Sequence, residues 1–308
     1  MKGRTGYLFL SLFVGLFIGS SGPVFAACGP LFLAADPPGK FEVALSLGLA
    51  STRLDTLYST RYSTPFDAES VNMSSASQTL VINGRNGLAI GGSISYFPGK
   101  SFGIQVLADY FSSSLYGQNE PYKISFKYIG IDWPYPTPVE RTVESSIPWP
   151  DTEGKLHHLT LSLNSIVRFE AGRTAAFYLS AGLSYFRMWG EIASLGYSKY
   201  WMGGHAVLYS EHARLRASLE SAHKIGGNAA IGVKTNIFKS MFLFLEGRYF
   251  YCPKMGLKIT PTQILNQEEI YMPSALESLS RIGEIMNLTP LRLNPSYVGI
   301  RAGLGVQF

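Results

Sequence analysis

The chain has 308 residues, of which 46% are hydrophobic and 15% charged, and its formal net charge is +5. This modest charge comes without a basic cluster, which argues against a nucleic-acid-binding protein. Its two cysteines, Cys28 and Cys252, are too few for a disulfide-stapled scaffold. Only the N-terminal segment is apolar enough to cross a membrane as a helix.

The first residues have the layout of a secretory signal. Lys2 and Arg4 precede an apolar stretch over residues 6–18, and small residues follow up to Ala26. We expect cleavage after Ala26, so that residues 1–26 form a signal peptide of an exported protein.

A short leader, residues 27–39, then precedes the folded part. In an alternative interpretation, Phe25-Ala-Ala-Cys28 is a lipoprotein signal, and Cys28 becomes the acylated first residue. The phenylalanine stands where such signals usually have leucine, which weakens this alternative.

Eight segments carry only apolar, aromatic or small residues at every second position, and most of the polar residues of these segments stand between them. Such a period of two predicts β-strands with one apolar face. None of the residues on these apolar faces is charged. In chain order the segments are 41–49, 88–96, 102–110, 159–169, 177–185, 225–235, 241–251 and 297–308.

The opposite faces of the same strands carry charges. We expect these charges to lie inside a barrel, where acids and bases pair because a buried lone charge is costly. An eight-stranded barrel is just wide enough for side chains to fill it, so a filled interior is the main hypothesis and a conducting path the alternative. The interior charges are Glu42, Asp109, Arg168, Lys234, Glu246, Arg248 and Arg301.

The connections between these strands alternate between short and long. The short ones are Phe97–Ser101, Glu170–Thr174 and Phe238–Ser240. Aromatic residues gather at the strand ends beside the short turns and again at the opposite ends. Short turns on one side, long loops on the other and two aromatic belts are typical of barrels that cross an outer membrane.

With these strands, turns and belts, and with the terminal Phe308 strand, the chain resembles the small outer-membrane β-barrels of Gram-negative bacteria. The resemblance is to the OmpA and OmpX transmembrane type and to the opacity-like adhesins. It implies an all-β, transmembrane, antiparallel up-and-down barrel over residues 40–308, located in the cell outer membrane.

The resemblance also implies partners. These are outer-membrane lipid, lipopolysaccharide, and the barrel-assembly machinery, which would recognise the C-terminal strand through Tyr297, Leu304, Val306 and Phe308.

A ninth and tenth strand are the alternative to eight. Tyr122 to Tyr128 alternates, and Val139, Val143 and Ile147 could supply a partner strand. Arg141 would then face lipid, at a cost of about 2–4 kcal/mol near the midplane. We therefore expect these residues to form a hairpin that stands outside the membrane.

A helix is expected in the last long connection, over residues 273–287. Ser274 and Glu277 have the spacing of a capping box. Leu276, Leu279, Ile282 and Ile285 share one helical side.

No residue pattern points to catalysis, a cofactor or a metal. His158 and Thr160 have the spacing of a weak nucleophile pair, but no third group supports them. The histidines show no metal-ligand spacing and are expected to be solvated near the outer ends of the strands. They are His157, His158, His205, His212 and His223.

The sequence thus favours a non-enzymatic protein whose outer loops serve a structural, surface-recognition or adhesive role, with a host surface or other extracellular ligand as the partner. A porin or small-solute channel is the second hypothesis. A soluble exported β-sandwich is the third.

Overall fold

A computed structural model describes residues 40–52, 54–63, 71–99, 101–132, 137–171, 175–203, 206–268 and 278–308. The expected signal peptide, the leader and Cys28 lie outside these residues.

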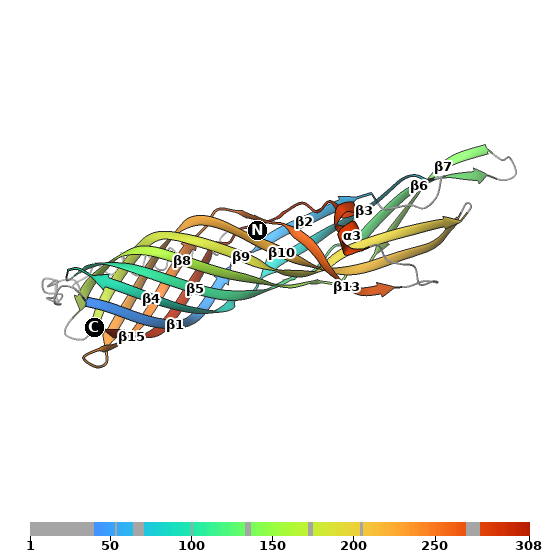
Figure 1. The fold of residues 1–308 in the computed structure, drawn as a ribbon. Helices are drawn as coiled ribbons and strands as arrows, with labels where there is room; N and C mark the ends of the chain where they lie inside the picture. Colours follow the sequence, from blue (N-terminus) through green and yellow to red (C-terminus); the bar gives the residue numbers. More distant parts are fainter. Residues whose placement is uncertain are drawn as a thin grey trace, which may run out of the picture.

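Eight strands close into a ring (Figure 1), which confirms the predicted barrel. Neighbouring strands around the ring are antiparallel, and the chain visits them in sequence order apart from the outer segments. The ring closes where the first strand pairs with the last, from Glu42 opposite Gln307 to Thr52 opposite Tyr297. The ring strands are β1 (Lys40–Thr52), β4 (Gly87–Phe97), β5 (Phe102–Gly117), β8 (Thr152–Ala171), β9 (Ala175–Gly203), β10 (Ala206–Asn236), β11 (Met241–Tyr251) and β15 (Tyr297–Gln307).

Each predicted apolar face lies on the outside of the ring. Leu45, Leu183 and Ile225 are 72%, 69% and 70% exposed, because successive side chains of a strand point to opposite sides of the sheet. A soluble protein would bury such residues, whereas lipid covers them in a membrane-spanning barrel. Phe41 and Phe102 border this band beside the short turns, and Tyr110 and Tyr249 border it at the other end. We call these two ends the turn end and the outer end.

Beyond the outer end, the expected long loops are largely regular structure. Four of the additional strands join side by side in the order β2, β3, β6, β7, and β13 extends the other side of the sheet by pairing with β10. The additional strands are β2 (Asp55–Tyr62), β3 (Val71–Gly84), β6 (Tyr122–Asp132), β7 (Thr137–Ile147), β12 (Met255–Leu257), β13 (Ile259–Glu268) and β14 (Leu291–Leu293). We call this part the outer extension.

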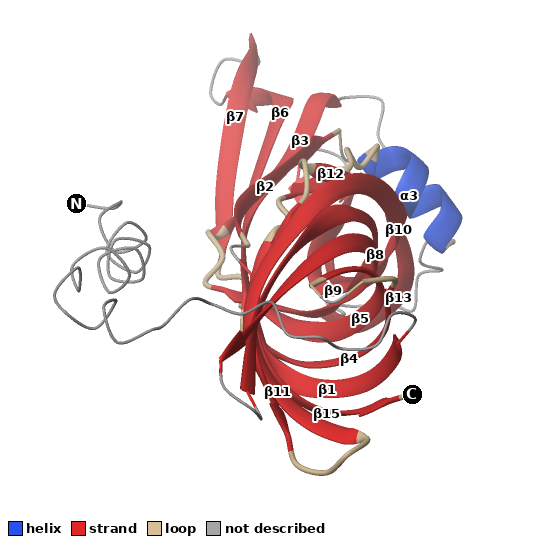
Figure 2. Ribbon diagram, turned by 90° about the vertical axis from the view of Figure 1, so that its left-hand side faces the viewer, coloured by secondary structure: helices blue, strands red, loops and turns tan. Residues whose placement is uncertain are grey.

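The β6–β7 hairpin stands apart from the ring (Figure 2), as predicted. Its strands pair with β3 and with each other, and none of the ring pairings involves them. The barrel therefore has eight strands rather than ten.

The helix α3 (Leu279–Met286) is shorter than expected. Its cap is Ser278, whose hydroxyl accepts a hydrogen bond from the amide of Arg281, and the expected cap Ser274 lies outside the described part of the chain. Residues 269–277, including Leu276 and Glu277, lie outside the described part. Of the predicted apolar side, Ile282 is fully buried.

The outer extension has a hydrophobic core of its own. Side chains from its strands, from α3 and from the upper parts of β8, β9 and β10 pack together there, including Leu80, Ile124, Leu195 and Ile282. In the described part of the chain, no helix is long and apolar enough to cross a membrane.

Candidate functional site

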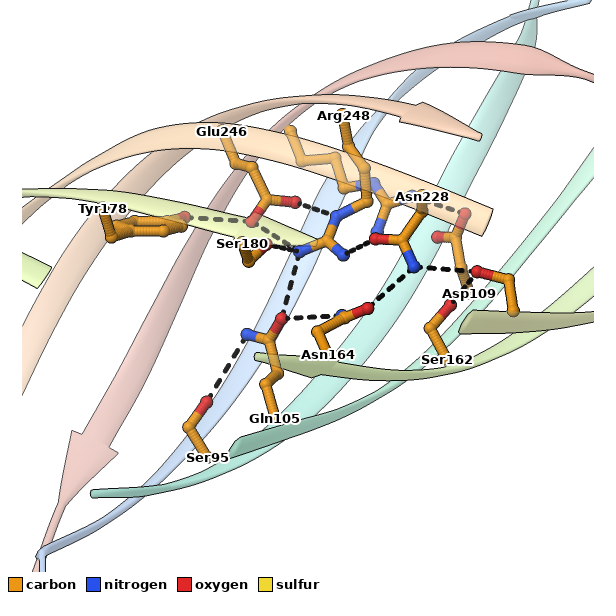
Figure 3. A network of polar contacts seen from close by, with 12 residues as sticks. Ser95, Gln105, Asp109, Ser162, Asn164, Tyr178, Ser180, Asn228, Glu246 and Arg248 are labelled. Carbon is orange, nitrogen blue, oxygen red and sulfur yellow. Dashed lines mark hydrogen bonds and ion pairs between the residues drawn. The ribbon is translucent and has the colours of Figure 1, made fainter. Parts of the chain in front are cut away.

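The barrel interior is organised around Arg248 of β11 (Figure 3). Its Nε and Nη2 atoms donate to both carboxylate oxygens of Glu246, at 2.7 and 2.9 Å. Nη1 donates to Asn228 at 2.6 Å, and Nη2 also donates to Gln105 at 3.1 Å. Because these partners come from β5, β10 and β11, a single guanidinium joins opposite walls of the ring.

Amide and hydroxyl side chains extend this network to β8 and β9. Asn228 donates to Asn164 at 2.7 Å and to Ser184 at 2.8 Å, and Tyr178 donates to Glu246 at 3.1 Å. Buried polar groups stabilise a fold only when they are hydrogen-bonded, and this interior satisfies that condition around Arg248.

The other interior charges form two separate groups. Near the turn end, Glu42 accepts from both Arg168 and Lys234, each at 2.5 Å. Nearer the outer end, Arg301 donates to Asp109 at 2.6 Å, and the hydroxyl of Tyr297 donates to the same oxygen at 2.7 Å. All seven charges expected inside the barrel are thus buried, and every acid contacts a base.

One cavity of about 40 Å³ lies in this interior, between the Glu42 group and Arg301. A cavity needs roughly 10–15 Å³ to hold one water molecule, so this space fits only a few. Its lining does not include the aromatic layer that lies nearer the outer end.

That layer consists of four aromatic rings in contact, some stacked and some tilted. Phe111 lies 4.2 Å from His158 and 4.6 Å from Tyr297, and Phe250 lies 4.4 Å from Tyr297, measured between ring centroids. The hydrophobic core of the outer extension continues above them. A polar interior, an aromatic layer and a hydrophobic core therefore follow one another from the turn end to the outer extension.

His158 corrects an expectation from the sequence, because it is buried in this layer and is not solvated. Thr160, its partner in the weak nucleophile pair, is hydrogen-bonded to Tyr297 instead. Of the other histidines, His212 contacts the hydroxyl of Ser198 through Nδ1 at 2.8 Å. His157 and His223 lie on the barrel exterior, and His205 lies outside the described residues.

Metal-binding clusters are absent from the residues that the structure describes, as no three of their His, Cys, Asp or Glu side chains come together.

The residues expected to form an assembly signal divide between the two faces of β15. Tyr297 points inward, whereas Leu304 and Phe308 are exterior, with Phe308 75% exposed. Val306 is half-buried. The amide of Phe308 donates to the carbonyl of Phe41 at 2.8 Å, which extends the barrel seam to the last residue.

In the outer extension, side chains bond to one edge of the β9 backbone. The pairing of β9 with β8 ends at Ile192 while its pairing with β10 continues, so amides and carbonyls on the side away from β10 need other partners. Gln78 supplies two of them, since its side chain donates to Ser194 O at 3.0 Å and accepts from Gly196 N at 2.9 Å. Trp149 donates to Ser194 O at 2.8 Å.

Tyr62 completes this edge. Its hydroxyl accepts from the amide of Ser198 at 2.9 Å and is hydrogen-bonded to the hydroxyl of Tyr122. Burial raises the pKa of Tyr62 and that of Tyr122, so both hydroxyls stay protonated. These contacts fix the layer of β2, β3 and β6 against β9, and the alternation of apolar residues gave no sign of them.

The tip of the extension offers an unpaired strand edge. Among the described residues, β7 pairs only with β6, so one side of its backbone has no strand partner. Val139 and Val143 are 36% and 37% exposed, and Glu140 forms an exposed ion pair with Lys127. Exposed strand edges are common sites of recognition by an added strand.

Comparison with solved structures finds barrels from bacteria. The chain is similar to the outer membrane protein OprG from Pseudomonas aeruginosa (TM-score 0.44, 10% identity, covering 89% of this chain and 98% of that one). It is also similar to a major outer membrane protein from Thermus thermophilus (TM-score 0.42, 12% identity, 88% and 100%). A third is Ail, the attachment invasion locus protein of Yersinia pestis (TM-score 0.33, 10% identity, 88% and 100%).

No protein-family model and no curated protein sequence matches the chain. The fold is therefore assigned from the strand order of the structure and not from a sequence match. An antiparallel ring of eight strands, with an apolar exterior and a charged interior, is the fold of a small transmembrane β-barrel.

Proposed function

We propose that this protein is a surface-recognition or adhesion protein of the outer membrane, in which a closed barrel anchors the outer extension. The observation that carries the proposal is the packed core of that extension. Flexible loops would have no such core, whereas here the strands beyond the lipid-facing band are held by buried side chains and by the Tyr62 and Gln78 contacts. A rigid exposed platform is what recognition by loops and edges requires.

The alternative function, a solute channel, receives less support. The interior is occupied by paired charges, by the aromatic layer and by the hydrophobic core, with one small cavity near the turn end. These layers support a filled barrel rather than a conducting one.

The rest of the proposal concerns export and assembly. Residues 1–26 direct the chain out of the cytoplasm, residues 27–39 form a periplasmic leader, and residues 40–308 form the barrel and its extension. Lipidation at Cys28 remains the alternative for the N-terminus. Outer-membrane lipid and lipopolysaccharide surround the barrel, and the barrel-assembly machinery receives β15. We propose no catalytic activity.

Removal of the β6–β7 tip tests the recognition role. Ser125 and Glu144 lie opposite each other in register, so an Asn-Gly turn can join them in place of residues 126–143. This design retains Tyr122 and Ile124, which belong to the hydrophobic core. Cells that display the full protein should adhere more strongly than vector controls to cultured epithelial cells or to wells coated with fibronectin or collagen, and the shortened variant should lose this gain.

A matched control replaces the exposed pair Lys258 and Glu220 with serine, which leaves the tip intact. The proposal fails if full-length and vector cells adhere equally, or if the shortened variant keeps the gain.

Planar-bilayer recordings test the closed barrel separately. Inserted protein should be electrically silent. Steady, reproducible openings would instead support the channel.

A further inference from the structure

A group of aromatic and basic side chains lies on the barrel exterior at the outer end. It covers four adjacent ring strands, and the register places His157 directly opposite Trp189, and Arg187 directly opposite His223. We call it the outer-rim cluster. Its members are Tyr110 of β5, His157 of β8, Tyr185, Arg187 and Trp189 of β9, and His223 of β10.

Two tyrosines orient the two histidines in the same way. The hydroxyl of Tyr110 lies 2.8 Å from Nδ1 of His157, and that of Tyr185 lies 2.6 Å from Nδ1 of His223. A phenol is a better donor than an imidazole, so a neutral ring that accepts at Nδ1 carries its own proton on Nε2. Both histidines therefore present an Nε2–H donor on the side away from the tyrosine.

Arg187 supplies a permanent positive charge between them. Its guanidinium carbon lies 5.2 Å from the ring centre of Trp189, and the Trp189 ring stacks on His157 with centroids 5.5 Å apart. Among the residues that the structure describes, Arg187 forms no ion pair with an acid. Its charge is thus held in place by an aromatic ring and is available to an anion from outside.

The position of the outer-rim cluster indicates which part of the membrane surrounds it. On the same exterior face, the lipid-facing band follows immediately, with Leu183 69% and Ile225 70% exposed. This border is where lipid headgroups lie in a membrane-spanning barrel. The cluster is also one-sided, because the large apolar side chains that the structure describes on the exterior at the outer ends of the other four ring strands take the place of charged ones within those strands. These are Leu49, Leu88, Tyr249, Tyr251 and Val298.

We infer that the outer-rim cluster binds the phosphate group of a phosphorylated glycolipid in the outer leaflet. Arg187 binds the phosphate through its planar pair of donors, and the Nε2–H groups of His157 and His223 approach it from the two neighbouring strands. The acyl chains of the same lipid cover Leu183 and Ile225. This inference rests on the proposed function, because it requires the barrel to span the membrane.

The test measures lipid binding to folded protein in detergent micelles by native mass spectrometry. The probe is a glucosamine-disaccharide lipid that carries two phosphates, compared with the same lipid after dephosphorylation. The intact protein should bind the phosphorylated form preferentially. Arg187→Gln should weaken that binding about tenfold, the effect of losing one charge-assisted hydrogen-bonded contact.

A second variant tests the site even if Arg187→Gln does not fold. Replacing Tyr110 and Tyr185 together with phenylalanine leaves every charge in place but removes the hydroxyls that orient the histidines. It should weaken binding about threefold, for the loss of neutral hydrogen bonds.

Arg85→Gln is the matched control. Arg85 also lies over a tyrosine, 4.9 Å from the ring centre of Tyr116, but without a histidine pair. Tyr116 is six residues beyond Tyr110 on β5, about 20 Å farther along the strand. This control should bind the lipid as the intact protein does.

The outcomes separate the two proposals. Equal binding of both lipids, equal losses in Arg187→Gln and Arg85→Gln, or competition by millimolar inorganic phosphate would each overturn the lipid site. The proposed function fails in a different way, if the protein is extracted from cells without detergent.

Discussion

At the scale of single residues, Arg248 and Glu246 form a buried ion pair inside the barrel. Arg248 is fully buried and Glu246 is 4% exposed, and both face the interior from adjacent inward positions of β11. Arg248→Leu should destabilise the protein by about 3–5 kcal/mol, because it leaves a buried carboxylate without its base. The free energy of unfolding in urea, measured in micelles, checks this.

The double variant Glu246→Gln/Arg248→Leu serves as the control. It should be more stable than Arg248→Leu alone, since it removes the charge that the single change leaves unpaired. Equal or greater loss in the double variant would show that packing, not charge, dominates at this position.

Gly303 has a different role, which is to leave space. A Cβ atom there would lie 2.2 Å from the carbonyl oxygen of Leu45 and 2.4 Å from the ring of Phe244. Gly303→Ala should therefore cost about 1–3 kcal/mol of unfolding free energy. Gly247→Ala is the comparison, since nothing lies within 4 Å of its Cβ position, and it should leave the same measurement nearly unchanged.

At the scale of elements, the alternation of apolar residues predicted the eight ring strands but not the outer parts of β9 and β10. From Ile192 to Ser198, every residue of β9 is buried, because the core and the β2–β3 layer cover it from different sides. A strand buried on both faces loses the period of two on which the prediction depended. The interior charges follow from the same alternation, but the joining of Glu42 to both Arg168 and Lys234 depends on how the strands are staggered around the ring, which no local pattern encodes.

The edge of β9 yields a prediction of its own. Tyr62→Phe removes the acceptor of the Ser198 amide and should cost about 1–3 kcal/mol, since a buried amide is then left without a partner. Native-state hydrogen exchange at Ser198 should speed up, while amides of the ring strands keep their rates. Tyr116→Phe, at an exposed ring of β5, should change neither the free energy of unfolding nor the exchange rate at Ser198. An unchanged exchange rate in Tyr62→Phe would show that this hydrogen bond does not stabilise the outer extension.

At the scale of the whole molecule, two leucines of equal exposure test where the membrane lies. Leu183 of β9 is 69% exposed in the exterior band, and Leu57 of β2 is 68% exposed in the outer extension. In phospholipid vesicles, Leu183→Arg should lower the free energy of unfolding by up to about 2–4 kcal/mol, whereas Leu57→Arg should change it by less than about 0.5 kcal/mol. Equal, small effects would favour the soluble β-sandwich.

The seam between β1 and β15 also constrains how the molecule forms. Its pairs join the first and last strands of the ring, so the contacts that seal the barrel have the largest sequence separation in the fold. Folds dominated by such distant contacts form slowly, because the loop between the strands must be closed before the pairing can compensate for the lost entropy. Until β15 arrives, β1 presents an open edge to any other strand nearby. Sealing of the ring therefore has to be the late step of folding, and protection of the β1 edge during that interval decides whether the chain folds or aggregates.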